Sequence, residues 1–286
     1  MANSGGSMPK TIWFVWFQGL RNAPYVVRKC HESWVVRNPD WRVVALDEAT
    51  LPSVASVNYS AGNIAGLSRQ HQADLLRLDL LSHHGGAWAD ATCFCVQPLE
   101  DWLPQNLGSG FFAFHRPRPN RIISNWFLAA EPGNALASRM FERMLAYWGD
   151  HAFRNAQRPL LAKGLTRLLR GSARTRGWWF SPVVTDLLRV SPYFAFMYMF
   201  ERLVREDAEC ARIWAYTPKI SAGPPHRLYR AGLLSPASAE LRAEIDRAEV
   251  PVYKTAWNLG GQDIHGDSVL GYLLSQPLAP GYSSTS

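Results

Sequence analysis

The stretch HHGGAWADATCFCVQPLEDWL, residues 83–103, places a carboxylate, Asp90, among apolar residues that have the composition of a buried β-strand. A lone carboxylate in such surroundings costs several kcal/mol unless a charged group meets it. We therefore expect Asp90 to have a charged partner and to mark the functional site.

The residues before this stretch predict alternating strands and helices. KTIWFVWF (10–17) is apolar almost throughout, which is typical of a strand buried on both faces of a sheet. Apolar positions within 23–38 recur at helical spacing, and WRVVALD (41–47) reads as a second strand. A strand, a helix and a strand in under 40 residues are typical of the start of a nucleotide-binding α/β sheet. Residues 48–67 are expected to be loop with one helical turn.

The rest of the chain continues the α/β pattern. The expected elements are a helix from near Ser68 to Gly85-Gly86, a strand over 87–96, short strands within 105–135, a helix over 135–151, a helix over 193–207, and a strand, turn and helix that close the chain. Because no repeat or long linker interrupts them, we expect one domain over residues 9–286, preceded at 1–8 by a disordered tail or a cloning remnant.

Hydropathy and charge limit the location and the partners of the protein. MANSGGSMPK lacks the apolar segment of a secretory signal, and the longest strongly apolar run (190–200) is about half of the ~20 residues that a membrane span requires. We expect a cytoplasmic protein, with peripheral contact to the inner face of the cell membrane as an option. The formal net charge of +7 favours an anionic partner, either a nucleotide, a phospholipid surface or a nucleic acid.

One basic tract has two possible explanations. Residues 151–190 contain eight Arg or Lys and a single acid, Asp186. The tract is either a solvated helix face or a contact for anionic lipid or for a lipid-diphosphate acceptor.

A second pair of charged residues is expected near Asp90. Asp74 and Arg77 are three residues apart in the helix that precedes the glycines, so they share a helix face that can border the end of the Asp90 strand. An acid that bonds sugar hydroxyls, a guanidinium that binds phosphate and a second acid at a strand end suit a nucleotide-sugar. The alternatives are an ordinary intrahelical ion pair and a structural pairing of Asp90 with a lysine.

Several motifs together resemble one enzyme family. They are PKTIWFVWFQG (9–19), SW with NPDW (33–41), ADLLRLDLL with GGAWADAT (73–92), ISNWF (123–127), SPYFAF (191–196) and VYKTAW (252–257). In this order they resemble the capsular-polysaccharide-synthesis branch of bacterial glycosyltransferases, which is related to sugar transferases with a DXD motif and more distantly to glucosylating clostridial toxins. The resemblance implies a GT-A-type fold, that is, a Rossmann-like mixed sheet flanked by helices.

The resemblance assigns roles around Asp90. It implies that Trp16 stacks on the donor base, that Asp74 and Arg77 contact its ribose and phosphate, and that Asp90 is the first acid of the DXD element. The alternative for Trp16 is a core residue of the buried strand. Thr92 departs from the pattern, because metal-dependent relatives have an aspartate there that binds Mn²⁺ or Mg²⁺ directly. A hard cation prefers charged oxygen ligands, so the metal is expected to bind Asp90 and Thr92 weakly or to be absent.

Other donor contacts follow from the same resemblance. Trp88 is expected in the pocket wall or the core, and Asn125 either contacts the donor or acceptor or satisfies a buried backbone group. Lys254 and Trp257 correspond to a lid over the diphosphate, or else are a solvated lysine beside a core indole.

Two residues near the end of the chain are further metal candidates. His265 and Asp267 either complete the metal shell or cap the helix that starts at Ser268.

The predicted reaction is sugar transfer from a UDP- or GDP-sugar to a surface or capsular polysaccharide, or to another glycan or lipid-linked glycan. Asp90, Arg77 and Lys254 are the candidate catalytic residues, because cations near the leaving phosphates stabilise the developing charge. The resemblance implies retention of the anomeric configuration. The rival functions are an inactive nucleotide-sugar-binding scaffold and a basic nucleic-acid binder, although no nucleic-acid recognition motif is present and we expect no nucleic-acid partner.

Overall fold

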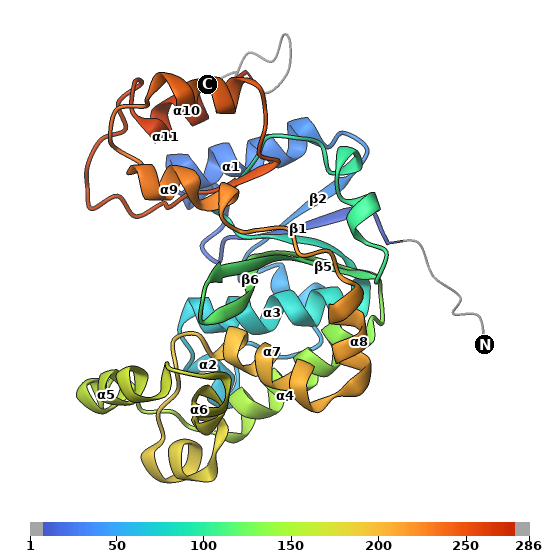
Figure 1. The fold of residues 1–286 in the computed structure, drawn as a ribbon, viewed down its shortest axis with the longest axis vertical. Helices are drawn as coiled ribbons and strands as arrows, with labels where there is room; N and C mark the ends of the chain where they lie inside the picture. Colours follow the sequence, from blue (N-terminus) through green and yellow to red (C-terminus); the bar gives the residue numbers. More distant parts are fainter. Residues whose placement is uncertain (1–7, 278–286) are drawn as a thin grey trace, which may run out of the picture.

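The computed structural model describes residues 8–277 of the chain (Figure 1). Apart from Met8, the tail or cloning remnant expected over residues 1–8 lies outside the described residues.

A five-stranded mixed sheet forms the centre of the fold (Figure 1). Its spatial order is β2 (Arg42–Leu46), β1 (Thr11–Val15), β3 (Gly86–Ala89), β6 (Arg121–Ala130) and β5 (Phe111–Arg118). β1 is parallel to both of its neighbours, whereas β6 is antiparallel to β3 and to β5. The prediction of an α/β fold with a Rossmann-like mixed sheet flanked by helices is confirmed.

The strand β1 is buried on both faces, as predicted. Ile12 and Phe14 belong to one apolar core, and the alternate residues Trp13 and Val15 belong to another. Successive side chains of a strand point to opposite faces, so the two cores lie on opposite sides of the sheet.

Helices cover both faces of the sheet (Figure 1). The core that contains Ile12 and Phe14 is covered by α1 (Tyr25–Arg37), α9 (Arg227–Ala231), α10 (Ala239–Asp246) and α11 (Val269–Leu274). The opposite core is covered by α3 (Arg69–His84), α4 (Ala135–Asp150), α7 (Ala195–Glu206) and α8 (Ala208–Tyr216). α3 begins after Ser68, whose side chain accepts a hydrogen bond from the His71 amide, and ends at Gly85, where φ is +67°.

The prediction of one strand over residues 87–96 is wrong. The segment forms two strands in different sheets, because β3 ends at Ala89 and β4 (Cys93–Cys95) pairs antiparallel with β7 (Val252–Lys254). Between them, the amide of Asp90 bonds to the carbonyl of Trp126, and the carbonyl of Asp90 accepts the amide of Cys93 at 2.8 Å. This turn takes the chain out of the central sheet and leaves Asp90 at its edge.

Shorter elements complete the described chain. They are α2 (Gly62–Ala65), α5 (Pro159–Leu169), α6 (Ala173–Gly177), a π-helix (Val183–Leu188), and 3₁₀ turns at Leu20–Asn22, Leu51–Ser53, Leu99–Asp101, Pro104–Asn106, Trp178–Phe180 and Pro224–His226. A third, small apolar cluster around Trp179 and Val190 joins α5 to the turns that follow it. Within residues 8–277, no helix combines the length and the apolar character that crossing a membrane demands.

Candidate active site

A cavity of about 740 Å³ lies at the carboxyl ends of β1 and β3. Ligands of α/β sheets bind outside these strand ends. Nearly all of the predicted site residues line this cavity, namely Trp16, Asp74, Arg77, Trp88, Asp90, Thr92, Asn125, Lys254 and Trp257. Segments that are far apart in the sequence therefore meet around one space.

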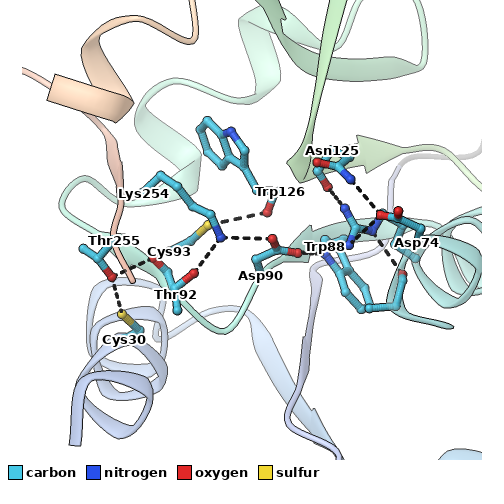
Figure 2. Close-up of polar contacts among 12 residues, drawn as sticks. Cys30, Asp74, Trp88, Asp90, Thr92, Cys93, Asn125, Trp126, Lys254 and Thr255 are labelled. Atoms are coloured by element: carbon cyan, nitrogen blue, oxygen red, sulfur yellow. Dashed lines mark hydrogen bonds and ion pairs between the residues drawn. The ribbon is translucent and has the colours of Figure 1, made fainter. Parts of the chain in front are cut away.

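Asp90 has bonding partners at both carboxylate oxygens (Figure 2). Trp88 Nε1 donates to Oδ1 at 2.9 Å, and Arg77 Nη2 lies 3.3 Å from the same oxygen. Lys254 Nζ donates to Oδ2 at 3.0 Å. The side chain of Asp90 keeps 24% of its surface exposed, so the carboxylate still faces the cavity. The expected charged partner is present, and Asp90 has two.

Arg77 links Asp90 to a second acid. Its Nη2 lies 3.2 Å from Asp74 Oδ1. Asn125 Nδ2 donates to that same oxygen at 2.7 Å (Figure 2). The guanidinium also donates to the backbone carbonyls of Ala73 and Asn125. Asp74 and Arg77 thus form the intrahelical pair of the structural alternative, and Arg77 reaches Asp90 in addition.

The lysine comes from a remote part of the chain. Lys254 lies in β7 directly opposite Cys93 of β4, and this pairing brings it beside the turn that carries Asp90 and Thr92. Its ammonium donates to Thr92 Oγ1 at 2.6 Å as well as to Asp90 (Figure 2). The next residue, Thr255, fixes the strand through an amide bond to the Thr92 carbonyl at 2.8 Å.

Aromatic side chains line the rest of the cavity. Trp16 and Trp257 meet edge to face with ring centroids 5.5 Å apart, and Trp257 is 48% exposed. The indole N–H of Trp16 is buried and has no hydrogen-bond partner among the described residues. The guanidinium of Arg77 lies 5.1 Å from the ring of Trp88, which is within cation–π distance.

Burial and neighbouring charges act in opposite directions on the titratable groups. Burial would raise the pKa of Asp90, but Lys254 and Arg77 outweigh it and hold the pKa below its usual value. Burial would lower the pKa of Lys254, but Asp90 raises it above its usual value. Burial raises the pKa of Asp74 despite the proximity of Arg77. The Asp90–Lys254 pair is therefore ionised at neutral pH.

His265 and Asp267 do not join this group. Both are exposed, and neither lines the cavity. Ser268 caps α11 by accepting the amide of Gly271, while its hydroxyl donates to the carbonyl of His265. The two residues thus belong to the turn that precedes α11, and the side chain that caps this helix is that of Ser268.

The sequence interpretation gave no role to several residues that line the cavity. They are Gln18, Asn22, Arg69, Gln70, Tyr193, Phe194, Phe196 and Met197. Phe196 lines the cavity, with its ring centroid 5.8 Å from the guanidinium of Arg77. The signal for it was the SPYFAF stretch, which carries the family resemblance without pointing to a role.

The donor set of the cavity does not fit Mn²⁺ or Mg²⁺. Hard divalent cations bind several oxygen ligands, with carboxylates foremost. Here both oxygens of Asp90 and the hydroxyl of Thr92 already contact cationic or N–H groups. Among residues 8–277 there is no group of three or more His, Cys, Asp or Glu side chains placed to hold an ion.

Comparisons with known proteins give one family model and relatives that are named glycosyltransferases. A family model described as "Capsular polysaccharide synthesis protein" matches residues 2–154, a range that includes Asp74, Arg77, Asp90 and Asn125 but not Lys254. The chain is 31% identical over 163 residues to "O-glycosyltransferase braB" of Annulohypoxylon truncatum, covering 49% of this chain and 38% of the relative. It is 25% identical over 172 residues to "Probable glycosyltransferase FCK3" of Fusarium pseudograminearum, covering 53% and 43%.

The chain thus matches less than half the length of these two relatives. Among solved structures, "PaToxG Glycosyltransferase" aligns with a TM-score of 0.41 at 14% identity, covering 73% of this chain and 75% of that one. The UDP-bound glycosyltransferase domain of the YGT toxin aligns with a TM-score of 0.38 at 10% identity, covering 84% and 89%.

Proposed function

The chain belongs to the capsular polysaccharide synthesis protein family, and from that premise we propose that it is a GT-A-type glycosyltransferase that uses a nucleoside-diphosphate-sugar donor. One observation carries the proposal: two cations, Arg77 and Lys254, flank a single ionised carboxylate, Asp90, inside a cavity lined by indoles. Cations suit the diphosphate, the carboxylate suits sugar hydroxyls, and flat rings suit the base.

The bond changes follow from this assignment. The bond between the anomeric carbon and the diphosphate oxygen breaks, and its electron pair stays on the diphosphate. An acceptor hydroxyl forms the new bond to the anomeric carbon and gives its proton to the leaving diphosphate. Arg77 and Lys254 lower the barrier because they are in place before the negative charge develops.

We propose retention of configuration because the family resemblance implies it, and the contacts of Asp90 argue against a covalent intermediate on this residue. Arg77, Trp88 and Lys254 contact both oxygens of Asp90, and these contacts to two cations and an N–H group make the carboxylate a weak nucleophile. We therefore assign Asp90 the role of holding the two cations and the sugar. The acceptor attacks from the face that the diphosphate leaves.

The residues that line the cavity suggest the classes of donor and acceptor. The Trp16–Trp257 pair suits the base of a UDP- or GDP-sugar, and Asp74 with Asn125 suits the ribose hydroxyls. We propose a glycan or lipid-linked glycan as acceptor, of the surface or capsular polysaccharide type.

A donor-release assay tests the proposal. The purified chain is given a panel of UDP- and GDP-hexoses with a mixture of oligosaccharide acceptors, and free nucleotide is measured, with nucleotide affinity measured in parallel by calorimetry. We expect one donor class to bind and to turn over. Tight binding without release of nucleotide would assign the inactive scaffold function instead, and no binding of either class would contradict the proposal.

A further inference from the structure

Lys254 holds the first and third residues of the Asp-Ala-Thr turn together. Its ammonium is 3.0 Å from Asp90 Oδ2 and 2.6 Å from Thr92 Oγ1 (Figure 2). These two positions are the ones that carry carboxylates in a DXD element. A divalent cation bound by both groups would have to lie between the same two oxygens, at about 2.0–2.6 Å from each, and the ammonium already bridges them. Lysine and metal therefore compete for one place.

The charges of the turn match an ammonium rather than a divalent ion. Two carboxylates would present two negative charges, but with Thr92 the turn presents only that of Asp90. A single ammonium neutralises it. The raised pKa of Lys254 agrees with this pairing, since the ammonium stays charged beyond its usual range.

The ammonium also has capacity for a ligand. An ammonium has three N–H donors, and among residues 8–277 two of them bond to Asp90 and Thr92. Its side chain is 20% exposed and lines the cavity. The lysine is firmly placed, because β7 pairs with β4 and Thr255 bonds twice to the Thr92 carbonyl, through its amide and its hydroxyl.

We propose that the ammonium of Lys254 takes the place of the divalent cation and binds the donor diphosphate directly, so that this enzyme needs no metal. The inference rests on the proposed function, since it names the group that neutralises the diphosphate of that donor. Arg77 supplies the second positive charge from the other side of Asp90.

Nucleotide binding with and without metal tests the inference. UDP and GDP are titrated by calorimetry into the wild-type chain in EDTA, in MnCl₂ and in MgCl₂. We expect affinities within about twofold of one another. In EDTA, Lys254→Ala should weaken binding at least tenfold, whereas Lys163→Ala, which removes an exposed lysine outside the cavity, should have no effect.

A designed variant provides the converse test. Lys254→Ala combined with Thr92→Asp restores two carboxylates and removes the ammonium, so nucleotide binding should become dependent on Mn²⁺, and Mn²⁺ bound to the protein should appear by paramagnetic resonance. If wild-type binding or turnover is lost in EDTA and restored by Mn²⁺, the inference is overturned while the proposed function survives. If neither nucleotide binds under any of these conditions, the proposed function itself fails.

A different surface carries a second inference. The outer face of α5 presents Leu160, Lys163, Arg167 and Leu168, all of which are exposed, with the two leucines at 83% and 72%. At 100° per residue, Leu160, Lys163 and Arg167 lie on the side away from Leu161, Leu165 and Leu169, which pack into the small apolar cluster, and Leu168 lies at the border between the two sides. The helix therefore has one leucine face turned inward and a mixed leucine and cation face turned outward.

The turns that follow α5 also carry exposed apolar side chains. Trp178, Val183 and Leu187 are also exposed, at 57%, 51% and 71%. Seven of the eight cations in the tract 151–190 are exposed, while Arg176 is buried against Glu201, so these exposed apolar side chains lie in a segment with a net positive surface charge. Figure 1 shows α5 at the periphery, away from the sheet.

We infer that this face rests on an anionic phospholipid surface. Leucine and tryptophan enter the headgroup boundary while lysine and arginine remain with the anionic headgroups. The charge of the tract selects this occupant over a neutral apolar partner.

Co-sedimentation with vesicles tests this second inference. We expect the chain to bind vesicles of phosphatidylcholine with 30% phosphatidylglycerol at least fivefold better than pure phosphatidylcholine, with the difference reduced by salt. Leu160→Glu with Leu168→Glu should abolish the binding. Tyr229→Glu, at a side chain that is 58% exposed outside the tract, should not. Equal partition onto both vesicle types, or unchanged binding by the double variant, would overturn the inference.

Discussion

At the scale of single residues, the charge of Asp90 holds the two cations of the site in place. Asp90→Asn keeps the size of the side chain but removes the charge that Arg77 and Lys254 share. We expect sugar transfer to fall at least tenfold, which corresponds to ~1.4 kcal/mol or more of lost transition-state stabilisation. The measurement is kcat for nucleotide release, compared with Asp101→Asn at an exposed position outside the cavity. Unchanged turnover in Asp90→Asn would remove this residue from the mechanism.

The same carboxylate makes a pH-dependent contribution to stability. The pKa of Asp90 is below its usual 3.8, so its ionised form stabilises the fold above that value, and the contribution is lost as the pH falls through the lowered pKa. We expect the Tm difference between wild type and Asp90→Asn to stay constant between about pH 5 and 8 and to shrink below about pH 3.8. Calorimetric scans across this range measure it. A difference that instead grows on acidification would show that the pKa is raised.

The two charged partners of Asp90 differ in how far they could be predicted from the sequence. Burial of an acid in an apolar segment predicted that Asp90 has a charged partner. Local spacing placed Arg77 close to it, but nothing in the spacing pointed to Lys254, which is 164 positions away. Only the resemblance of VYKTAW to the family suggested it, because long-range pairing of β4 with β7 leaves no local signal.

At the scale of elements, the junction between α3 and β3 depends on Gly86. Its φ is +94°, and a Cβ there would lie 2.5 Å from the backbone oxygen of Thr11 in β1. We expect Gly86→Ala to destabilise the protein by about 2 kcal/mol or more, because the strain adds to a clash with a backbone atom that cannot move freely. Chemical denaturation measures the change in the free energy of unfolding.

Gly108→Ala is the matched control, because a Cβ at that position meets no atom within 4 Å. It should change the free energy of unfolding by less than about 0.5 kcal/mol. Equal stability of the two variants would contradict the close approach of β3 to β1.

The wrong prediction of one strand over residues 87–96 shows what the apolar pattern of a segment cannot predict. Its apolar run continues across the turn, so periodicity alone gives one strand. The chain divides because Asp90 bonds to Trp126 on one side and β4 finds β7 on the other. Both partners are distant in sequence, and a local window cannot contain them.

At the scale of the whole molecule, the order of the elements was more predictable than their assembly. The apolar run of β1 and the helical spacing within α1 and α3 are patterns of short segments. The sheet and its flanking helices could therefore be predicted. The cavity could not, because it combines Trp16 and Asp90 with Phe196 and Lys254, which are far apart in the sequence and come from segments that pack on both sides of the sheet.

Because the cavity joins distant segments, a bound nucleotide should stabilise the C-terminal strand that lines it. UDP or GDP that contacts both Asp74 and Lys254 would join the first half of the chain to its C-terminal strand, and the binding free energy would oppose local opening of that strand. We expect saturating nucleotide to slow amide hydrogen exchange at least tenfold in residues 252–257, where the Thr255 amide bonds to Thr92. Exchange in α5, none of whose residues lines the cavity, should not change. Mass spectrometry of the exchanged peptides measures both regions, and equal protection of α5 and 252–257 would contradict direct contact between the nucleotide and Lys254.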